Sequence, residues 1–206
     1  MKTNIFLVRH GETEHNVGKK ITGQKDSNLT LLGVEQARLT GEYLKKYNIS
    51  SIYSSDLGRA YKTALIIGKS FNKKPLKDKR LRENNLGTWT ELSIDEINKK
   101  RAHLISTGLK REDITPPGGE NTYDHVERVM QFLNEILIVN AGKNIIIVAH
   151  SRTNKVLISY LNNTAINNYY NFNQSNCCIN RIEYDNNYKK FKILTVDYIK
   201  HLKSSQ

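Results

Sequence analysis

The sequence predicts an α/β protein, a three-layer α/β/α sandwich built on a mainly parallel central sheet. Short apolar runs typical of buried strands alternate along the chain with helical patterns. A length of 206 residues suits one compact domain, and no repeat or low-complexity linker divides it. We therefore expect a single domain over residues 1–206, with a short cap or insertion around residues 84–122.

The first half of the chain begins with Ile5–Val8, a continuous apolar run that suits a buried strand. Thr30 opens a helical pattern, Ile49–Tyr53 reads as a second strand, and Asp56 is a good N-cap for another helix. Apolar or small residues recur every three or four positions in both helices: Leu31, Val34, Ala37, Gly41 and Leu44, then Leu57, Ala60, Ala64 and Ile67.

The middle of the chain combines two helices with an irregular stretch. Ser93 and Glu96 have the spacing of a capping box, which predicts a helix start. The segment Ala102–Glu120 is rich in Gly and Pro and is expected to be mostly loop. A longer helix is marked by Val126, Val129, Leu133 and Ile136.

The last third contains Ile145–Val148, four β-branched residues in succession and the strongest strand signal. Helix-like sequence follows over Asn154–Leu161. Two alternating runs, Cys178–Tyr184 and Phe191–Val196, predict a hairpin around Asp185.

Composition sets limits on the class of protein. The formal charge is 32 − 20 = +12, with basic residues scattered through the chain, so anionic ligands are attracted and most lysines are expected to be solvated. The apolar start is too short for a signal peptide or a membrane span. The adjacent pair Cys177 and Cys178 suits neither a disulfide nor a metal site. A cytoplasmic protein without membrane contact is expected.

The residues suited to chemistry follow strands. Arg9-His10 and His150 come directly after two buried strands, and ligands bind beyond the carboxyl ends of parallel strands. Arg9 offers a fork suited to phosphate, and Gly11 lets backbone approach a ligand. Taken alone, such an Arg-His pair is usually just a polar strand boundary.

Two further residues strengthen this interpretation. Arg59 is expected in the first turn of a helix, a position that favours anions. Glu83 lies in a loop close to Trp89, and partly apolar surroundings would raise the pKa of its carboxyl, as a general acid needs. The ordinary alternatives are a surface arginine and a carboxylate paired with a basic residue.

The motifs together resemble the histidine phosphatase superfamily, in its phosphoglycerate mutase-like branch. They run in the family's order over residues 5–184: Arg9-His10-Gly11-Glu12-Thr13 with Asn16, Gly23 with Asp26 and Leu29-Thr30, Ser55-Asp56-Leu57 with Arg59-Ala60 and Thr63-Ala64, Leu81, Glu83, Leu86-Gly87 and Trp89, Pro117-Gly118-Gly119-Glu120, and Val148-Ala149-His150.

The resemblance implies a role for each matching residue. His10 is the nucleophile that becomes phosphohistidine, while Glu83 protonates the leaving oxygen and then deprotonates the attacking water. The implied phosphate-binding set is Arg9, Asn16, Thr22, Gly23, Arg59, His150 and Ser151. Two arginines and a protonated His150 would supply positive charge without a metal, so neither a metal nor a cofactor is expected.

The chain departs from the family pattern after His150. Ser151 and Arg152 stand where two glycines are usual, and Asn154 and Lys155 stand near a usual arginine. Ser151 still offers a backbone N–H. Arg152 either binds a second anionic group of the substrate, together with Lys110 and Arg111, or points to solvent. Thr90-Glu91 also replaces the usual Glu-Gly after Trp89, which affects the expected loop geometry but not Glu83.

The favoured function is a metal-independent phosphomonoesterase acting on small phosphorylated metabolites, in a monomer or homodimer. A cofactor-dependent phosphoglycerate mutase is the alternative, but the stretch from Glu83 to Glu120 is short and lacks the Tyr-Gly sequence usual there. A non-catalytic relative that binds anions or nucleic acid is a third reading. It is disfavoured because the aromatic residues form no evident stacking platform, and Tyr169-Tyr170-Asn171-Phe172 is expected to pack beneath the late hairpin.

Overall fold

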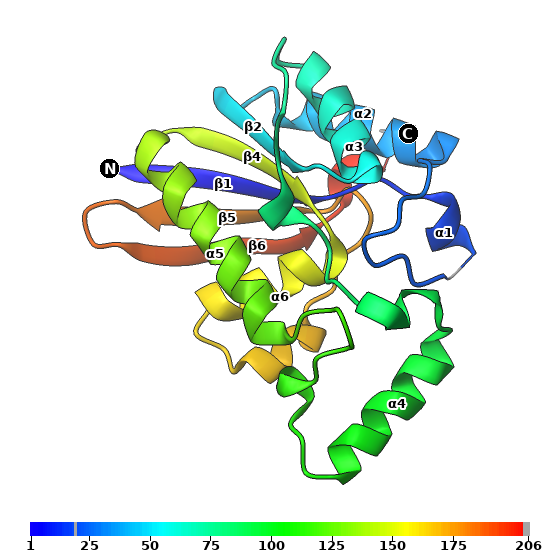
Figure 1. Ribbon diagram of the computed structural model, residues 1–206. Helices are drawn as coiled ribbons and strands as arrows, with labels where there is room; N and C mark the ends of the chain where they lie inside the picture. Colours follow the sequence, from blue (N-terminus) through cyan, green and yellow to red (C-terminus); the bar gives the residue numbers. More distant parts are fainter. Residues whose placement is uncertain (19, 204–206) are drawn as a thin grey trace.

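A six-stranded sheet forms the centre of the computed structural model, which describes residues 1–18 and 20–203 (Figure 1). The strand order is β3-β2-β4-β1-β5-β6, with parallel pairing from β3 through β1 and antiparallel pairing of β5 and β6. The predicted mainly parallel sheet and late hairpin are confirmed. The strands are β1 Lys2–Arg9, β2 Ile49–Ser55, β3 Leu76–Asp78, β4 Asn144–Ala149, β5 Ile179–Asp185 and β6 Lys190–Tyr198.

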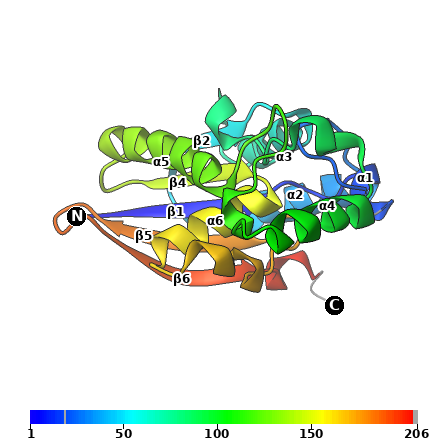
Figure 2. The same cartoon turned by 60° about the horizontal axis from the view of Figure 1, so that its bottom comes forward.

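Two helical layers cover the two faces of this sheet, as Figures 1 and 2 show. Successive side chains of a strand point to opposite faces, so Ile5 and Leu7 join one apolar cluster while Phe6 and Val8 join the other. The helices α5 and α6 pack on the first cluster, and α2 and α3 on the second. The helices are α1 Glu14–Val17, α2 Leu31–Leu44, α3 Gly58–Lys69, α4 Ile94–Ser106, α5 Thr122–Val139 and α6 Ser151–Leu161.

Two predicted helix starts are confirmed, and two other helix boundaries differ from the prediction. The Thr30 cap and the Ser93–Glu96 capping box are both present. The helix expected from Asn154 begins three residues earlier at Ser151, and α4 extends to Ser106 into the stretch predicted as loop. The short edge strand β3 has too few residues to carry a recognisable alternation and was not predicted.

The prediction that Asp56 caps α3 is also wrong. Leu57 occupies the N-cap position and makes no side-chain cap bond. The Asp56 carboxylate instead accepts two hydrogen bonds from Arg82, at 2.7 Å from Nε and 2.6 Å from Nη2. This fork stabilises the ionised carboxylate and lowers the pKa of Asp56. The Asp56 side chain is therefore paired with Arg82 and does not cap α3.

The segment expected to form a cap carries a small apolar cluster of its own. Leu86, Trp89, Ile97 and Ile114 are buried together, and Ile21 packs against them. In Figure 1 the helix α4 stands away from the sheet, on the same side as α1. This segment therefore lies beside the loop that follows α1.

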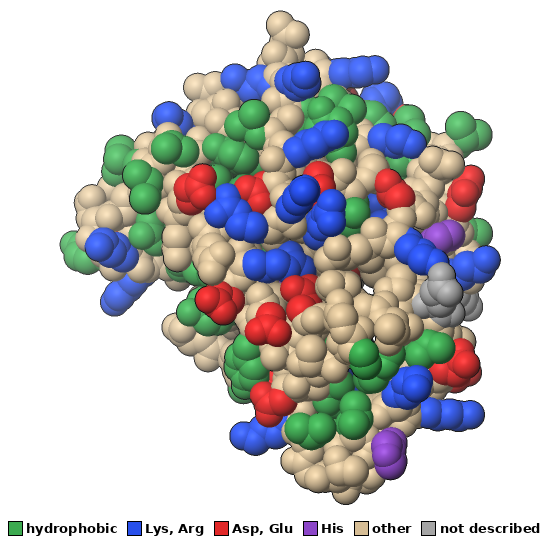
Figure 3. Space-filling model, in the orientation of Figure 1, with side chains coloured by type: hydrophobic (Ala, Val, Ile, Leu, Met, Phe, Trp, Pro, Cys, Tyr) green, Lys and Arg blue, Asp and Glu red, His purple; other side chains and the backbone are tan. Residues whose placement is uncertain are grey.

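Charged side chains are dispersed over the face shown in Figure 3, where Lys and Arg are interspersed with Asp and Glu. This agrees with the scattered basic residues of the sequence. Within the described part of the chain, every helix is too short or too polar to cross a lipid bilayer.

The loop after β1 is clamped against the first turn of α2 by two glycines. A Cβ on Gly33 would lie 2.1 Å from the carbonyl oxygen of Glu12, and one on Gly11 would lie 2.4 Å from that of Gly33. The Thr30 N–H also donates to the Glu12 carbonyl at 3.0 Å. The absence of side chains at these two positions lets α2 hold the His10 loop by its backbone.

We predict that Gly33→Ala destabilises the fold by about 1–3 kcal/mol, because backbone must move to admit the methyl group. Urea unfolding should show this as a lower midpoint at an unchanged slope. Gly18→Ala is the matched control, since its Cβ would meet nothing closer than 3.4 Å. Equal midpoints for the two variants would contradict the proposed clamp.

Candidate active site

The parallel pairing of β1 with β4 brings the two predicted histidines together. Arg9 is in register with Ala149, and the His10 N–H donates to the Ala149 carbonyl at 3.0 Å. The ring centroids of His10 and His150 are 5.3 Å apart. Two residues separated by 140 positions in the sequence thus share one edge of the sheet.

His10 is held as a neutral imidazole with a defined orientation. Its Nδ1 lies 2.8 Å from the Gly11 carbonyl oxygen, which accepts only, so Nδ1 carries the proton and Nε2 has the free electron pair. Burial, followed by the charges of Arg9 and Arg59, holds the pKa of His10 well below its ordinary value. The ring therefore has the form that a nucleophile needs.

Two arginines, the half-buried Arg9 and the buried Arg59, flank this ring. Arg59 is 2% exposed, and it donates to the carbonyl oxygens of Gly23 at 2.8 Å and Lys25 at 2.5 Å. Arg9 donates to the Gln174 carbonyl at 2.6 Å. Among the described residues, the buried Nε atoms of both arginines have no hydrogen-bond partner. Buried donors of this kind are costly until an acceptor binds them.

His150 is fully buried, and this burial disfavours the protonated form that the sequence analysis expects. Burial, followed by the charge of Arg59, lowers the pKa of His150 well below its ordinary value. Its Nε2 lies 2.9 Å from Ser55 Oγ, and its buried Nδ1 has no partner within residues 1–18 and 20–203. The arginines therefore bring the permanent positive charge to the site, and His150 adds a buried ring nitrogen without a partner among the described residues.

Glu83 lies at the N-terminus of α6 rather than in apolar surroundings. Its carboxylate accepts hydrogen bonds from the backbone N–H groups of Arg152 and Thr153, both at 3.2 Å, and from that of Asn84 at 3.0 Å. Trp89, expected beside it, packs instead in the cluster with Leu86, Ile97 and Ile114. The free N–H groups of a helix start thus orient this carboxylate.

A second contact to Glu83 was not predicted. The Thr153 hydroxyl lies 3.3 Å from Glu83 Oε1 and 3.1 Å from Nε2 of the buried His125. Neither residue follows a strand or a glycine motif, so no local signal marks them. Thr153 contacts Glu83 directly, and His125 contacts Thr153 because α5 and α6 pack side by side.

Asn16 and Ser151 lie at the start of two helices. The Asn16 side chain closes the capping box of α1, and its Oδ1 accepts from the Thr13 N–H at 3.1 Å and from Asn176 Nδ2 at 3.0 Å. With the oxygen engaged, the amide nitrogen is the end that Asn16 can offer to a ligand. Ser151 is the first residue of α6.

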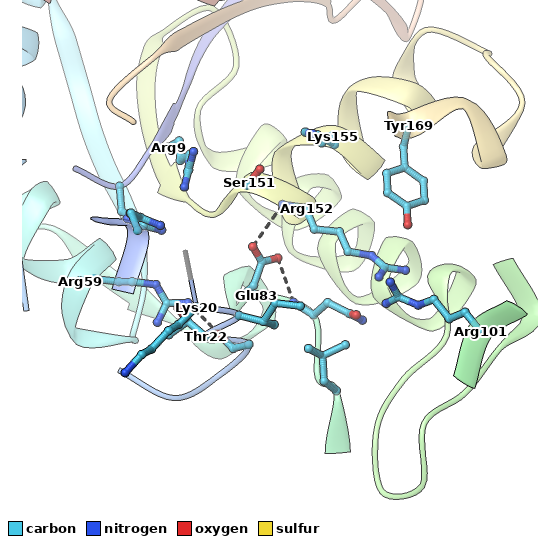
Figure 4. Close-up of a pocket in the computed structure, with 16 residues that line it drawn as sticks. Arg9, Lys20, Thr22, Arg59, Glu83, Arg101, Ser151, Arg152, Lys155 and Tyr169 are labelled. Atoms are coloured by element: carbon cyan, nitrogen blue, oxygen red, sulfur yellow. Dashed lines mark hydrogen bonds between the residues drawn. The ribbon is translucent and has the colours of Figure 1, made fainter. Parts of the chain in front are cut away.

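These residues line a pocket of about 330 Å³ (Figure 4). Eight of the nine predicted site residues line it: Arg9, His10, Asn16, Thr22, Gly23, Arg59, Glu83 and Ser151. His150 lies behind His10 without exposed surface. The sequence analysis did not assign seven other lining residues to the site, although Leu86 belongs to one of the matched motifs: Lys20, Ile21, Asn84, Leu86, Arg101, Lys155 and Tyr169.

Arg152 lines the pocket instead of pointing to solvent, and its binding of a second anionic group stays a prediction. Tyr169 also lines it, with its ring 5.1 Å from Arg152 Cζ. This tyrosine is packed, as expected, but against Val126 of α5 and Val156 of α6 and not beneath the hairpin. The side chain of Tyr170 is outside the described residues. Lys110 and Arg111 do not line this pocket, although Arg111 borders a small crevice next to it together with Arg152.

Within the described residues, no group of three or more His, Cys, Asp or Glu side chains is arranged to hold a metal ion.

Comparison with known proteins decides the family. The model of the histidine phosphatase superfamily (branch 1) matches residues 5–197. The chain belongs to this superfamily. The predicted family, the phosphoglycerate mutase-like fold and the histidine-phosphatase type of enzyme are thereby confirmed.

Relatives of this histidine phosphatase share most of its length. A protein of Proteus mirabilis named probable phosphoglycerate mutase GpmB is 35% identical over 186 residues, which cover 88% of this chain and 85% of that protein. The structure of YhfR of Bacillus stearothermophilus matches with a TM-score of 0.86 and 28% identity over 98% of this chain and all of that one. A mycobacterial glucosyl-3-phosphoglycerate phosphatase in complex with VO3 matches with a TM-score of 0.81 and 27% identity, covering 95% and 99% of the two chains.

We predict that Arg9→Met raises the pKa of His10. Removing a neighbouring positive charge makes protonation of the ring less costly, so the ring gains its proton at a higher pH than in the parent protein. Imidazole ¹⁵N shifts followed by NMR from pH 8 to pH 5 measure this, with the His10 signals assigned by their loss in His10→Ala. Arg38→Met, which changes an exposed arginine paired with Glu35, should leave the His10 titration in place. The same shift in both variants would contradict the proposed electrostatics.

Proposed function

We propose that this protein is a metal-independent phosphomonoesterase that hydrolyses small phosphorylated metabolites through a phosphohistidine at His10. The observation that carries the proposal is the His10 Nδ1 contact to the Gly11 carbonyl, which leaves Nε2 as a nucleophile in a pocket flanked by Arg9 and Arg59. Phosphoryl transfer needs an in-line nucleophile and positive charge around the equatorial oxygens, and this arrangement offers both.

The first step transfers the phosphoryl group to the enzyme. His10 Nε2 attacks phosphorus, the bond from phosphorus to the ester oxygen breaks, and Glu83 gives its proton to the leaving oxygen. Glu83 is suited to this role because it is the only acid among the described residues that line the pocket. The Gly11 carbonyl receives Nδ1–H throughout and stabilises the positive charge that develops on the ring.

Phosphoryl oxygens fit the polar groups around His10. The Nε atoms of Arg9 and Arg59 and Nδ1 of His150 are buried donors or acceptors without a partner in the described structure. Together with Asn16 and the backbone N–H of Ser151 they form the proposed cradle, while Thr22 and Gly23 border it on the side of the cap. The two arginines supply the positive charge that a metal ion supplies in other phosphoryl-transfer enzymes.

The second step releases phosphate. Glu83, now ionised, takes a proton from a water molecule whose oxygen attacks phosphorus, and the bond from phosphorus to Nε2 breaks. His10 returns to its neutral form and inorganic phosphate leaves. A mutase would use the same residues but return the phosphoryl group to a bound intermediate. The phosphatase is favoured because the segment between Glu83 and Glu120 is short and, in the described structure, holds one α-helix, α4, and two 3-10 helices of three to five residues.

The location, the assembly state and the partners of the protein are also proposals. We place the protein in the cytoplasm, where its buried free thiols Cys177 and Cys178 would stay reduced. We also propose that it works as a monomer or homodimer on small molecules and needs no nucleic acid.

We predict that the purified protein releases phosphate from p-nitrophenyl phosphate in the presence of EDTA and that His10→Ala reduces this rate by about a thousandfold or more. Rapid quenching should trap a phosphoenzyme that is labile to acid and stable to base in the parent protein only. Conversion of 3-phosphoglycerate to 2-phosphoglycerate with little phosphate release would instead assign a mutase. Activity lost with EDTA and restored by a divalent metal would overturn metal independence.

We predict that Glu83→Gln slows hydrolysis of an alkyl phosphate by about 10²–10⁴-fold and that of p-nitrophenyl phosphate much less, because only the alkoxide needs a proton to leave. Steady-state kcat/KM for glycerol phosphate and for the aryl ester measures the difference. Glu35→Gln, an exposed carboxylate on α2, is the control and should change neither value. An equal loss on both esters would argue against Glu83 as the acid.

A further inference from the structure

The two oxygens of the Glu83 carboxylate have unequal surroundings. Oε1 accepts from the backbone N–H groups of Asn84 at 3.0 Å and Thr153 at 3.2 Å, and the Thr153 hydroxyl lies 3.3 Å from it. Oε2 accepts from one donor among the described residues, the Arg152 N–H at 3.2 Å. Three donors surround Oε1, so a proton added to this carboxylate is accommodated on Oε2.

The Thr153 hydroxyl has one proton, and its neighbours determine where that proton points. Its Oγ lies 3.0 Å from the Arg82 carbonyl oxygen and 3.3 Å from Glu83 Oε1. Both of these oxygens only accept while the carboxylate is ionised, so the hydroxyl proton points toward them. The remaining neighbour of Oγ is His125 Nε2 at 3.1 Å, and this nitrogen is therefore the donor.

The buried ring of His125 independently favours the same tautomer. Burial, followed by the charges of Arg128 and Arg152, holds the pKa of His125 well below its ordinary value, so the ring is neutral and carries one proton. Its Nδ1 has no hydrogen-bond partner within the described residues. A buried N–H without an acceptor is costly, which places the single proton on Nε2.

The carboxylate nearest to His125 does not compete for this proton. Glu120 Oε1 lies 4.0 Å from His125 Nδ1, which is beyond hydrogen-bond distance. Arg128 binds the same carboxylate at 2.7 and 2.8 Å. Within the part of the chain that the structure describes, the hydrogen bond of the His125 ring is thus the one to Thr153.

We propose that Thr153 and His125 are positioning residues for the general acid and that together they keep the transferable proton on Oε2 of Glu83. This inference rests on the proposed phosphomonoesterase function. His125 fixes the Thr153 hydroxyl as a donor, and the hydroxyl occupies Oε1. Oε2 is then the oxygen that gives its proton to the leaving oxygen and later takes one from water. In Figure 4 the Glu83 carboxylate extends into the pocket between Arg9 and Arg152, where one correctly oriented oxygen serves both steps.

The test uses two esters that differ in their need for an acid, glycerol phosphate and p-nitrophenyl phosphate. Thr153→Val removes the hydroxyl and keeps the shape of the side chain. We expect kcat for glycerol phosphate to fall about ten- to a hundredfold and kcat for the aryl ester to change less than about threefold. Thr153→Ser should restore the rate. His125→Leu should reproduce the selective loss, and His125→Gln, which keeps an N–H in place of that on Nε2, should avoid most of it.

Two controls isolate the effect that passes through Glu83. Thr3→Val removes another buried hydroxyl, which donates to the Asn140 carbonyl at 3.2 Å near the start of β1, at the opposite end of this strand from His10. It should lower stability and leave the ratio of the two rates unchanged. In a Glu83→Gln background, Thr153→Val should cause no further selective loss, because the acid on which it acts is already absent.

Two outcomes would overturn the inference. One is an unchanged rate on glycerol phosphate, or an equal loss on both esters, in Thr153→Val and His125→Leu, whether through unfolding or a displaced site. The other is a selective loss that persists in Thr153→Ser or adds to that of Glu83→Gln. Hydrolysis of p-nitrophenyl phosphate by the parent protein and its loss in His10→Ala separate these outcomes from failure of the proposed function, since the aryl ester needs no acid.

Discussion

The parallel pairing of β1 with β4 is the contact on which the site depends. Each strand is apolar on both faces, so burial between two helical layers fixes its register and leaves its last residue at a common edge. His10 follows one strand and His150 the other, and their rings meet there. A one-residue slip would exchange the faces of the strand and turn the His10 ring away from its neighbour.

The electrostatics of this edge follow from burial. Two guanidinium groups and two imidazoles lie together with little solvent. Burial and the neighbouring charges lower the pKa values of His10 and His150, which favours the neutral imidazoles. The arginines cannot lose their protons, so backbone carbonyls of Gly23, Lys25 and Gln174 surround them instead. Carbonyl oxygens compensate such charges only in part, and an arrangement of this kind favours a dianionic ligand over any neutral one.

The N-terminus of α6 links the reacting position to the rest of the pocket. Its first N–H groups hold Glu83, and its first residues place Ser151 beside the proposed phosphoryl site and Arg152 farther along the pocket. Where glycines would leave this helix start open, a serine and an arginine supply side chains. One helix start therefore orients the proposed acid and sets the charge that a substrate meets beyond it.

The sequence by itself determined five of the six strands of the sheet, and the family. Apolar runs such as Ile145–Val148 and caps such as Thr30 are local signals, and the ordered motifs around His10, Arg59 and Glu83 are read without coordinates. Only the tertiary structure decided the surroundings of Glu83, the use of Asp56 by Arg82, and the grouping of Arg101, Arg152 and Tyr169. The physical reason is that hydrogen-bond partners, burial and the resulting pKa values depend on which elements pack together, and neither spacing nor residue type specifies those contacts.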